Sequence, residues 1–412
     1  MKPQVEFKAN SKRSFVLILF FLGAALLIPD PAWNIMLIML GGVVILSFVW
    51  VRVLERSIQA QRYLRANWVA VGDVLVEQFE IENRSFFPAL WIQIAVESNV
   101  VGYRPAFVVN VGGRTKERWR QASVCTKRGR YEMGAWTLRL GDPFGLFECL
   151  FHYDEFKEII IHPPILPTVP VQLPSGNRDG RFRRKQISWQ NRINASSVRD
   201  YDPNDPMNII HWRSSAKTGS LHVRHFDPEA GGDVWLLLDL DQSMQLGQDR
   251  LSIEEQAVLL AASLAVKALQ ERRGVGLAAY GRMPQLVFPG RGESQRWRLL
   301  EALAMVSAEQ TVSLKTVLAD FQTVVQQGTA VLLVTANPSP DWLPLLNQLS
   351  RLGVTTSVAL FDRLAFGGRE NMSPLYNQIQ QMGLECTLLQ PGDIVQQTLE
   401  ISPFTLELGR VV

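Results

Sequence analysis

The sequence predicts a multidomain, membrane-anchored protein: an N-terminal transmembrane helical hairpin, a small β-sandwich, and an α/β domain with a mostly parallel sheet. Three observations predict it. Two apolar runs stand near the N-terminus, short alternating segments fill residues 66–164, and strands alternate with helices after residue 233. At roughly 150 residues per domain, the 412 residues leave room for two or three folded units.

The composition excludes several classes of protein. Apolar residues make up 47% and charged residues 20% of the chain, which excludes a wholly disordered or fibrous protein. The 42 Lys and Arg stand against 39 Asp and Glu, a net charge of +3, so we expect no nucleic acid as a partner. The 3 cysteines are widely separated, which excludes a disulfide framework and favours a reducing compartment.

The hairpin is predicted within residues 1–65, with helices at about 14–29 and 32–54. The second apolar run can cross a hydrocarbon core of ~30 Å, and the first is shorter. A cleaved signal peptide and a buried core hairpin are the alternatives. Basic residues flank both outer ends and none lies in the turn. We therefore expect a multi-pass protein of the inner membrane, with the lipid bilayer as a partner and both termini cytoplasmic.

Residues 66–164 are predicted to form the β-sandwich, because apolar and polar residues alternate in segments such as Val74–Ile81 and Leu90–Val96. The motif Gly141–Phe147 contains Asp-Pro followed by a glycine, which is typical of a structural corner. A ligand site at this corner is the alternative.

Residues 165–198 are predicted to be a linker that is first Pro-rich and then basic. Between residues 178 and 199 the sequence contains several Arg and Lys residues but a single acidic residue, Asp179. Such a stretch is typical of a solvated loop. Anionic lipid headgroups and an acidic partner surface are the alternatives for what it contacts.

The α/β domain is predicted from Val234–Leu240 and Ala330–Val334, which are continuously apolar, as in strands buried on both faces. Apolar residues recur at helical spacing in residues 253–271 and in later segments. These segments are predicted to be helices that cover the two faces of the sheet. Ligands of such sheets bind beyond the carboxyl ends of the strands. The functional site is therefore expected at the end of the first of these strands.

Asp239, Asp241 and Ser243 end that strand, and alternate residues of an extended chain project the same way, so their side chains can converge. Hard oxygen ligands at this spacing suit Mg²⁺. A metal-free cap of the strand end and a Mg²⁺ site are the two interpretations of this spacing. Two carboxylates without a cation would repel each other and raise one pKa.

The Asp-x-Asp-x-Ser pattern at residues 239–243 resembles the D-x-S-x-S metal-ion-dependent adhesion site of von Willebrand factor A domains, with Asp241 in place of a serine. The resemblance implies a threonine from a second loop, for which Thr311 is the candidate. It also implies an aspartate just after Val334, where this chain has Thr335, Ala336 and Asn337. Either Asp241 supplies the missing charge of this degenerate site, or the site is defunct.

A second resemblance rests on the block from Arg199 to Arg224, together with Lys127–Tyr131, Gly141–Phe147 and the two leading apolar runs. These are similar to a widespread bacterial family catalogued only as a domain of unknown function, the fifty-eighth. The resemblance implies a von Willebrand A-like (Rossmann-like) domain within residues 199–412, often encoded beside a MoxR-type AAA+ ATPase. The signature residues are Arg199, Asp200, Asp205, His211, Trp212 and Arg224.

We expect this signature block to be structural, with Ile210, Trp212 and Val223 packing against the sheet; contact with a partner is the alternative. No nucleophile elbow G-x-S-x-G is present, and we predict no enzyme. The first hypothesis is an inner-membrane scaffold that meets a cytoplasmic partner, a MoxR-type ATPase by resemblance, through a bound ion. The alternatives are a metal-dependent hydrolase using Asp239, Asp241 and His211, and a purely structural role.

Overall fold

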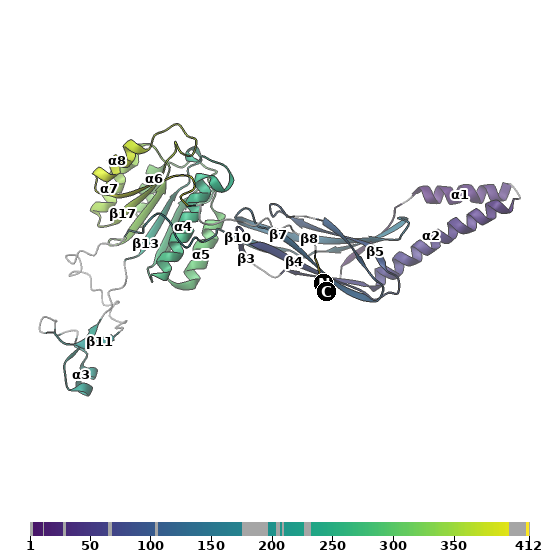
Figure 1. The fold of residues 1–412 in the computed structure, drawn as a ribbon, viewed down its shortest axis with the longest axis horizontal. Helices are drawn as coiled ribbons and strands as arrows, with labels where there is room; N and C mark the ends of the chain where they lie inside the picture. The colour runs from purple at the N-terminus through teal and green to yellow at the C-terminus, as the bar shows by residue number, and fades with distance from the viewer. Residues whose placement is uncertain are drawn as a thin grey trace. The chain divides into compact units, whose positions relative to one another are not determined.

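The structure is a computed structural model that describes residues 3–10, 12–27, 30–64, 68–103, 106–174, 197–202, 207, 210–225, 232–394 and 409–411. The chain divides into two compact units, residues 1–162 with 400–412 and residues 163–399. Figure 1 labels their main elements. The multidomain organisation, the apolar N-terminal helix and the presence of several β-sheets are as predicted.

The first unit contains two apolar helices and two β-sheets. One sheet holds β1, β3, β5, β6, β8, β9 and β10, and the other holds β2, β4, β7 and β19. The bounds are β1 Gln4–Ala9, α1 Lys12–Leu27, α2 Pro31–Ser57, β2 Ile58–Leu64, β3 Trp68–Ala70, β4 Val74–Asn83, β5 Ala89–Ser98, β6 Ala106–Val111, β7 Thr115–Val124, β8 Gly129–Gly141, β9 Phe147–Tyr153, β10 Lys157–His162 and β19 Gly409–Val411.

Both sheets of this unit share one apolar core. In β4 every second residue is buried, because successive side chains of a strand point to opposite faces. Phe79 of β4 lies edge-on to Trp136 of β8, with ring centroids 5.6 Å apart, so the two sheets meet face to face. The alternating segments of the sequence therefore build a two-sheet core.

Strand β1 precedes the helices and is not among the elements that the sequence predicts. It pairs antiparallel with β9, from Gln4 beside His152 to Ala9 beside Phe147. On the other side of the helices, β2 follows α2 directly and pairs with β4. Both ends of the helical hairpin are thus hydrogen-bonded into the same sandwich.

Helix α2 is the one helix in the described part of the chain that is long and apolar enough to cross a membrane; Val16–Leu27 forms a shorter apolar helix. The 27 residues of α2 give this helix a length of about 40 Å at about 1.5 Å per residue. The carboxylate of Asp30 caps its start by accepting a hydrogen bond from the N–H of Ala32 at 2.9 Å. Towards its end Ser47, Val51 and Leu54 are buried. The last turns of α2 therefore belong to the sandwich core.

The second unit is an α/β domain around a six-stranded sheet in the order β15-β14-β13-β16-β17-β18. Strand β15 is antiparallel to β14, and the other neighbours are parallel. The bounds are β13 Val234–Asp239, η4 Gln242–Met244, η5 Asp249–Leu251, α4 Ile253–Gln270, β14 Val275–Tyr280, β15 Gln285–Gly290, α5 Gly292–Met305, α6 Leu314–Gln322, β16 Ala330–Thr335, η6 Pro340–Trp342, α7 Leu343–Arg351, β17 Thr355–Phe361, α8 Ser373–Gln381 and β18 Glu385–Leu389.

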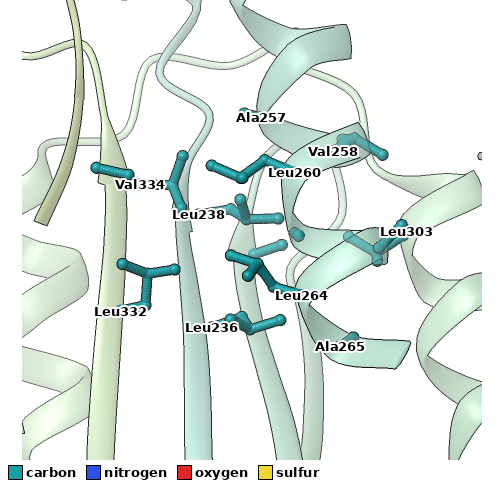
Figure 2. Packing of buried hydrophobic residues seen from close by; sticks show 14 of the residues in the cluster. Leu236, Leu238, Ala257, Val258, Leu260, Leu264, Ala265, Leu303, Leu332 and Val334 are labelled. Carbon is teal, nitrogen blue, oxygen red and sulfur yellow. The ribbon is translucent and has the colours of Figure 1, made fainter. Parts of the chain in front are cut away.

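Every residue of β13 and β16 is buried, which confirms the burial that their apolar runs predict. Figure 2 shows Leu236 and Leu238 of β13 beside Leu332 of β16, packed against α4. The alternate residues of both strands join a second cluster with α6 and α7 on the other face. Because helices cover both faces, neither face of these strands can carry a polar residue until the strand ends.

Residues 163–174 pack on this α/β domain, although their prolines predict a linker. Leu166 and Val171 are only 4% and 2% exposed and belong to its core. The N–H of Leu166 donates to Oγ of Ser263 at 2.9 Å, and Arg273 donates to the carbonyl oxygen of Pro174 at 2.8 Å. The segment has no helix or strand, but hydrogen bonds hold it to the domain at Leu166 and at Pro174. Residues 175–196, with most of the basic stretch, lie outside the described residues.

Candidate functional site

The candidate site lies where the carboxyl ends of β13 and β16 meet. Within the sheet, β13 lies between β14 and β16. The chain goes from β13 to β14 on one side of β13, and β16, which comes later in the sequence, is added on the other side. In open α/β sheets such a reversal of strand order leaves a crevice in which ligands bind. Asp239 is the last residue of β13 and Thr335 is the last residue of β16. The topology thus places these two polar side chains at the same point.

Asp239 is 5% exposed and uses both carboxylate oxygens. The hydroxyl of Thr335 donates to its Oδ2 at 2.6 Å, and the N–H of Asp241 donates to its Oδ1 at 3.3 Å. Burial raises the pKa of Asp239 to about 6; the two hydrogen bonds oppose this shift, and the charge of Asp241 adds to it. The environment of Asp239 therefore disfavours its charged form.

Asp241 is 4% exposed and starts the short helix η4. Its Oδ1 accepts hydrogen bonds from the N–H and the hydroxyl of Ser243, at 2.9 and 2.7 Å. In the described part of the chain neither Asp239 nor Asp241 forms an ion pair. Two carboxylates, two positions apart and almost out of contact with water, thus lie together without a basic partner among the described side chains.

The second predicted loop does reach this strand end. Gln310 forms a parallel bridge with Asp241, and its carbonyl oxygen accepts a hydrogen bond from the N–H of Gln242 at 3.0 Å. Thr311 follows and is exposed; within the described residues no hydrogen bond joins its hydroxyl to either carboxylate. We call the exposed residues around the two acids the rim; they are Gln242, Ser243, Gln310 and Thr311.

The third loop supplies a hydroxyl instead of an acid. Thr335 is 1% exposed, and its Oγ1 also accepts a hydrogen bond from the N–H of Asn337 at 3.0 Å. Asp341, the next acid along the chain, forms an ion pair with Lys315 at 2.8 Å, and hydrogen bonding to Lys315 lowers the pKa of Asp341. Asp341 therefore has a partner of its own away from Asp239.

Two residues that contribute to the site were missed in the sequence. Thr335 has a signal, since it is the first polar residue after a wholly apolar strand. Arg363 has none: it is 6% exposed, follows β17, and donates to the carbonyl oxygen of Met244 at 2.8 Å and to Glu370 at 3.0 Å. Hydrogen bonding to Arg363 lowers the pKa of Glu370. Arg363 thereby ties the loop after β17 to the loop that follows Asp241.

The donor atoms at this strand end fit a small hard cation. In the described part of the chain no three His, Cys, Asp or Glu side chains are grouped as metal ligands. Mg²⁺, however, is commonly held by one or two carboxylates with water completing its coordination. Asp239 and Asp241 would supply the carboxylates, and the hydroxyl of Ser243, 2.7 Å from Oδ1 of Asp241, is a further candidate oxygen ligand. A cation there would neutralise the charge that burial disfavours.

The signature block forms a small hairpin with a helix: β11 Ser197–Asp200 pairs antiparallel with β12 His222–His225, and α3 Trp212–Thr218 lies between them in sequence. His211 is the N-cap of α3, and its Nδ1 accepts a hydrogen bond from the N–H of Ser214 at 3.2 Å. Nδ1 of His222 lies 3.0 Å from the carboxylate of Asp200. No hydrogen bond or ion pair of the described residues joins His211 to Asp239 or Asp241.

Two of the residues expected to pack against the parallel sheet are buried, but the contact described for them is with each other inside this block. Ile210 and Val223 are 5% and 0% exposed and face each other across a bridge. Trp212, expected to pack against the sheet, is instead 67% exposed. Asp205 lies outside the described residues, and of Arg199 and Arg224 only the backbone is described, in β11 and β12.

Comparison with known sequences identifies one family and one relative. Residues 197–365 match the family described as "Protein of unknown function DUF58". "Uncharacterized protein YeaD" of Bacillus subtilis (strain 168) is 23% identical over 272 residues, which cover 62% of this chain and 64% of YeaD. The match thus spans slightly less than two thirds of that relative.

Two solved structures show distant likenesses. Proximal thread matrix protein 1 from the mussel byssus is 12% identical, with a TM-score of 0.30 over 40% of this chain and 44% of that chain. The CARDB domain of PF1109 from Pyrococcus furiosus, crystallised with di-metal ions, is 10% identical, with a TM-score of 0.19 over 26% and 94% of the two chains. At such scores neither likeness bears on fold or function.

Proposed function

We propose that this protein is a non-enzymatic membrane-anchored scaffold whose von Willebrand A-like domain meets a partner at the carboxyl ends of β13 and β16. One observation carries the proposal: two almost buried carboxylates without an ion pair in the described residues lie beneath an exposed polar rim, at the reversal of the strand order. A divalent ion, Mg²⁺ for example, bound by Asp239 and Asp241 would stabilise this arrangement.

The rim is the part that meets the partner in this proposal. Asp239 and Asp241 are 5% and 4% exposed, so they are not themselves presented to another protein. The ion they hold would be reached from the side of the exposed Ser243 and Thr311. A carboxylate of the partner would complete its coordination, as the resemblance to an adhesion site implies. A MoxR-type AAA+ ATPase is the partner that the family resemblance favours.

The membrane anchor is the hairpin of α1 and α2. In the proposal both helices cross the inner membrane and both termini are cytoplasmic. The attachment of β1 and β2 to one sandwich supports this topology, because it requires both ends of the hairpin to lie on the same side. The basic residues that flank the hairpin favour the cytoplasmic side. Labelling of Asn34→Cys by a membrane-impermeant maleimide in intact cells tests the topology, since Asn34 lies in the first helical turn of α2, at the end of the hairpin that is expected outside.

Binding of the ion is tested on the full chain in detergent micelles by titration with Mn²⁺, followed by electron paramagnetic resonance. We expect one site that Mg²⁺ competes for, and its loss in Asp239→Ala and Asp241→Ala. Asp320→Ala is the matched control, because Asp320 is an exposed acid on α6 of the same domain. Binding that survives both site variants would refute the assignment of the ligands.

Contact with the partner is tested by affinity capture from gently solubilised membranes, with and without a chelator. We expect a MoxR-type ATPase to be retained by the wild type and by Asp320→Ala, and to be lost with the chelator and in Asp239→Ala. The same captured proteins in every arm would contradict an ion-mediated contact.

A further inference from the structure

The hairpin end of the sandwich carries three turns whose position follows from the strand registers. Asn83 at the end of β4 pairs with Ile58, the first residue after α2, and Ala9 at the end of β1 pairs with Phe147. The turns that join β4 to β5, β6 to β7 and β8 to β9 therefore all lie at the end from which α1 leaves and to which α2 returns. The connection between β9 and β10 lies away from this end, beside the middle of β8, because Tyr153 pairs with Trp136 and Lys157 pairs with Met133.

Two of these turns hold a phenylalanine out in solvent. Phe86, between β4 and β5, is 78% exposed, and Phe144, between β8 and β9, is 57% exposed. The neighbouring aromatic residues are packed: Phe87 contacts Trp50 of α2 with ring centroids 4.6 Å apart, and Phe147 is buried. The core therefore uses one phenylalanine of each turn and leaves the other outside.

The turn of Phe144 is rigid. The buried carboxylate of Asp142 accepts hydrogen bonds from the N–H groups of Phe144 and Phe147, at 2.8 and 2.6 Å. Gly145 adopts a φ of 70°, a conformation that residues with a side chain rarely take. This explains the Asp-Pro-Phe-Gly motif as a structural corner but not the exposed ring of Phe144. The corner fixes the direction in which that ring points.

The turn of Phe86 is equally well fixed. Oδ1 of Asn83 accepts hydrogen bonds from the N–H and hydroxyl of Ser85, at 3.0 and 2.7 Å, and the carbonyl oxygen of Ser85 accepts one from the N–H of Arg114. A Cβ at Gly113 would lie 2.2 Å from the carbonyl oxygen of Phe86, so only glycine fits there. The guanidinium of Arg114 lies 5.9 Å from the ring centroid of Phe86.

We propose that Phe86 and Phe144 rest in the headgroup region of the bilayer that the hairpin crosses, so that the sandwich sits on the membrane surface. The inference rests on the proposed membrane anchor. Continuity supports it: α2 runs without a linker from its exposed apolar residues, such as Ile38 and Ile45, into the sandwich core at Val51. Exposed aromatic rings on rigid turns beside such a helix are suited to the interface, where an apolar ring gains contact with lipid.

The rings, not the charges, make this contact. Two of the described cations at this end are paired with acids: Arg84 with Glu82 at 2.7 Å and Arg52 with Glu55 at 2.8 Å. Arg114 lies over Phe86, as expected for an interfacial cation–π pair. The contact should therefore not depend on anionic lipid.

Nitroxide labels at four positions of the full chain test the proposal, after reconstitution into vesicles of phosphatidylethanolamine and phosphatidylglycerol. The variants are Phe86→Cys, Phe144→Cys, Ile38→Cys and the control Phe156→Cys, each with Cys386→Ser. Phe156 is 73% exposed in the connection between β9 and β10, which lies beside the middle of β8 and away from the hairpin end. The readout is the ratio of nitroxide collisions with oxygen to collisions with a water-soluble nickel complex.

We expect the ratio at positions 86 and 144 to be several-fold higher than at 156 and lower than at 38, and to be the same in phosphatidylcholine vesicles. Ratios at 86 and 144 equal to that at 156, with position 38 in hydrocarbon, would overturn the surface contact and leave the anchor intact. Position 38 in water would show that the anchor itself is wrong. A rise that requires phosphatidylglycerol would overturn the assignment to the aromatic rings.

Discussion

Replacement of Asp239 by asparagine should change how the stability of the α/β domain depends on pH. Asparagine keeps an oxygen that can accept the hydrogen bond from Thr335, but it is neutral at every pH. In the wild type, burial raises the pKa of Asp239 from 3.8 to about 6. A carboxyl group whose pKa is higher in the folded state loses stability as the pH rises from about 4 through about 6.

The magnitude follows from the same shift. At about 1.4 kcal/mol per pKa unit, the wild type without divalent ions loses about 3 kcal/mol of stability between pH 4 and pH 8 from this group. The stability of Asp239→Asn does not fall in this way with pH. The variant is, however, less stable by about 1 kcal/mol at every pH, because it loses the hydrogen bond from the N–H of Asp241. The variant should therefore be slightly less stable than the wild type at pH 4 and about 2 kcal/mol more stable at pH 8.

Hydrogen exchange of the β13 and β16 amides at increasing urea concentration measures this on the full chain in micelles, because it reports on the α/β domain alone. At pH 8, Mg²⁺ at about 100 times its Kd should raise the free energy of unfolding of the wild type by about 2.7 kcal/mol and leave that of Asp239→Asn unchanged. Asp320→Asn is the control and should follow the wild type. A constant difference between wild type and Asp239→Asn from pH 4 to pH 8 would refute the reasoning.

Substitutions at three further positions have defined outcomes. Thr335→Val removes the hydroxyl that donates to Asp239 and should destabilise the α/β domain by about 1–3 kcal/mol at pH 8, whereas Thr335→Ser should not; equal stability of the two variants in urea would contradict this. Asp142→Ala leaves two N–H groups of its turn without their acceptor and should speed amide exchange in β8 and β9 by the equivalent of about 1–3 kcal/mol; unchanged exchange would count against the corner. Trp212→Ala should alter stability by no more than about 0.5 kcal/mol because the side chain is 67% exposed, and a larger loss in thermal unfolding would show that the ring is packed.

The sequence predicts those parts of the fold that local patterns determine. The apolar runs of β13 and β16 require burial on both faces, and the alternation in β4 requires one buried face. Strand β1 could not be recognised in this way, because its residues are mostly exposed at the edge of a sheet and its partner, β9, is far along the chain. In residues 163–174 the prolines predict a linker but say nothing of what Leu166 and Val171 pack against.

The candidate site shows the same division. The spacing of Asp239, Asp241 and Ser243 is local, and the structure does bring these residues together. The contact between Asp239 and Thr335 depends on β16 lying beside β13, and the one between Arg363 and Met244 depends on the position of the loop after β17. The two residues of each pair are far apart in the sequence, and no local pattern indicates that they meet. The near burial of both acids likewise depends on how the loops close over the strand ends.

The pairing of β1 with β9 has a consequence for the order of events during synthesis. The ribosome releases β1 before both apolar helices, and it releases the strand that β1 pairs with only after them. The hairpin must therefore leave the ribosome while its leading strand is still without a partner. Once β9 has been made, the strands before and after the hairpin, β1 and β2, are both hydrogen-bonded into the sandwich. Separating either helix from the hairpin would then first require the sandwich to open.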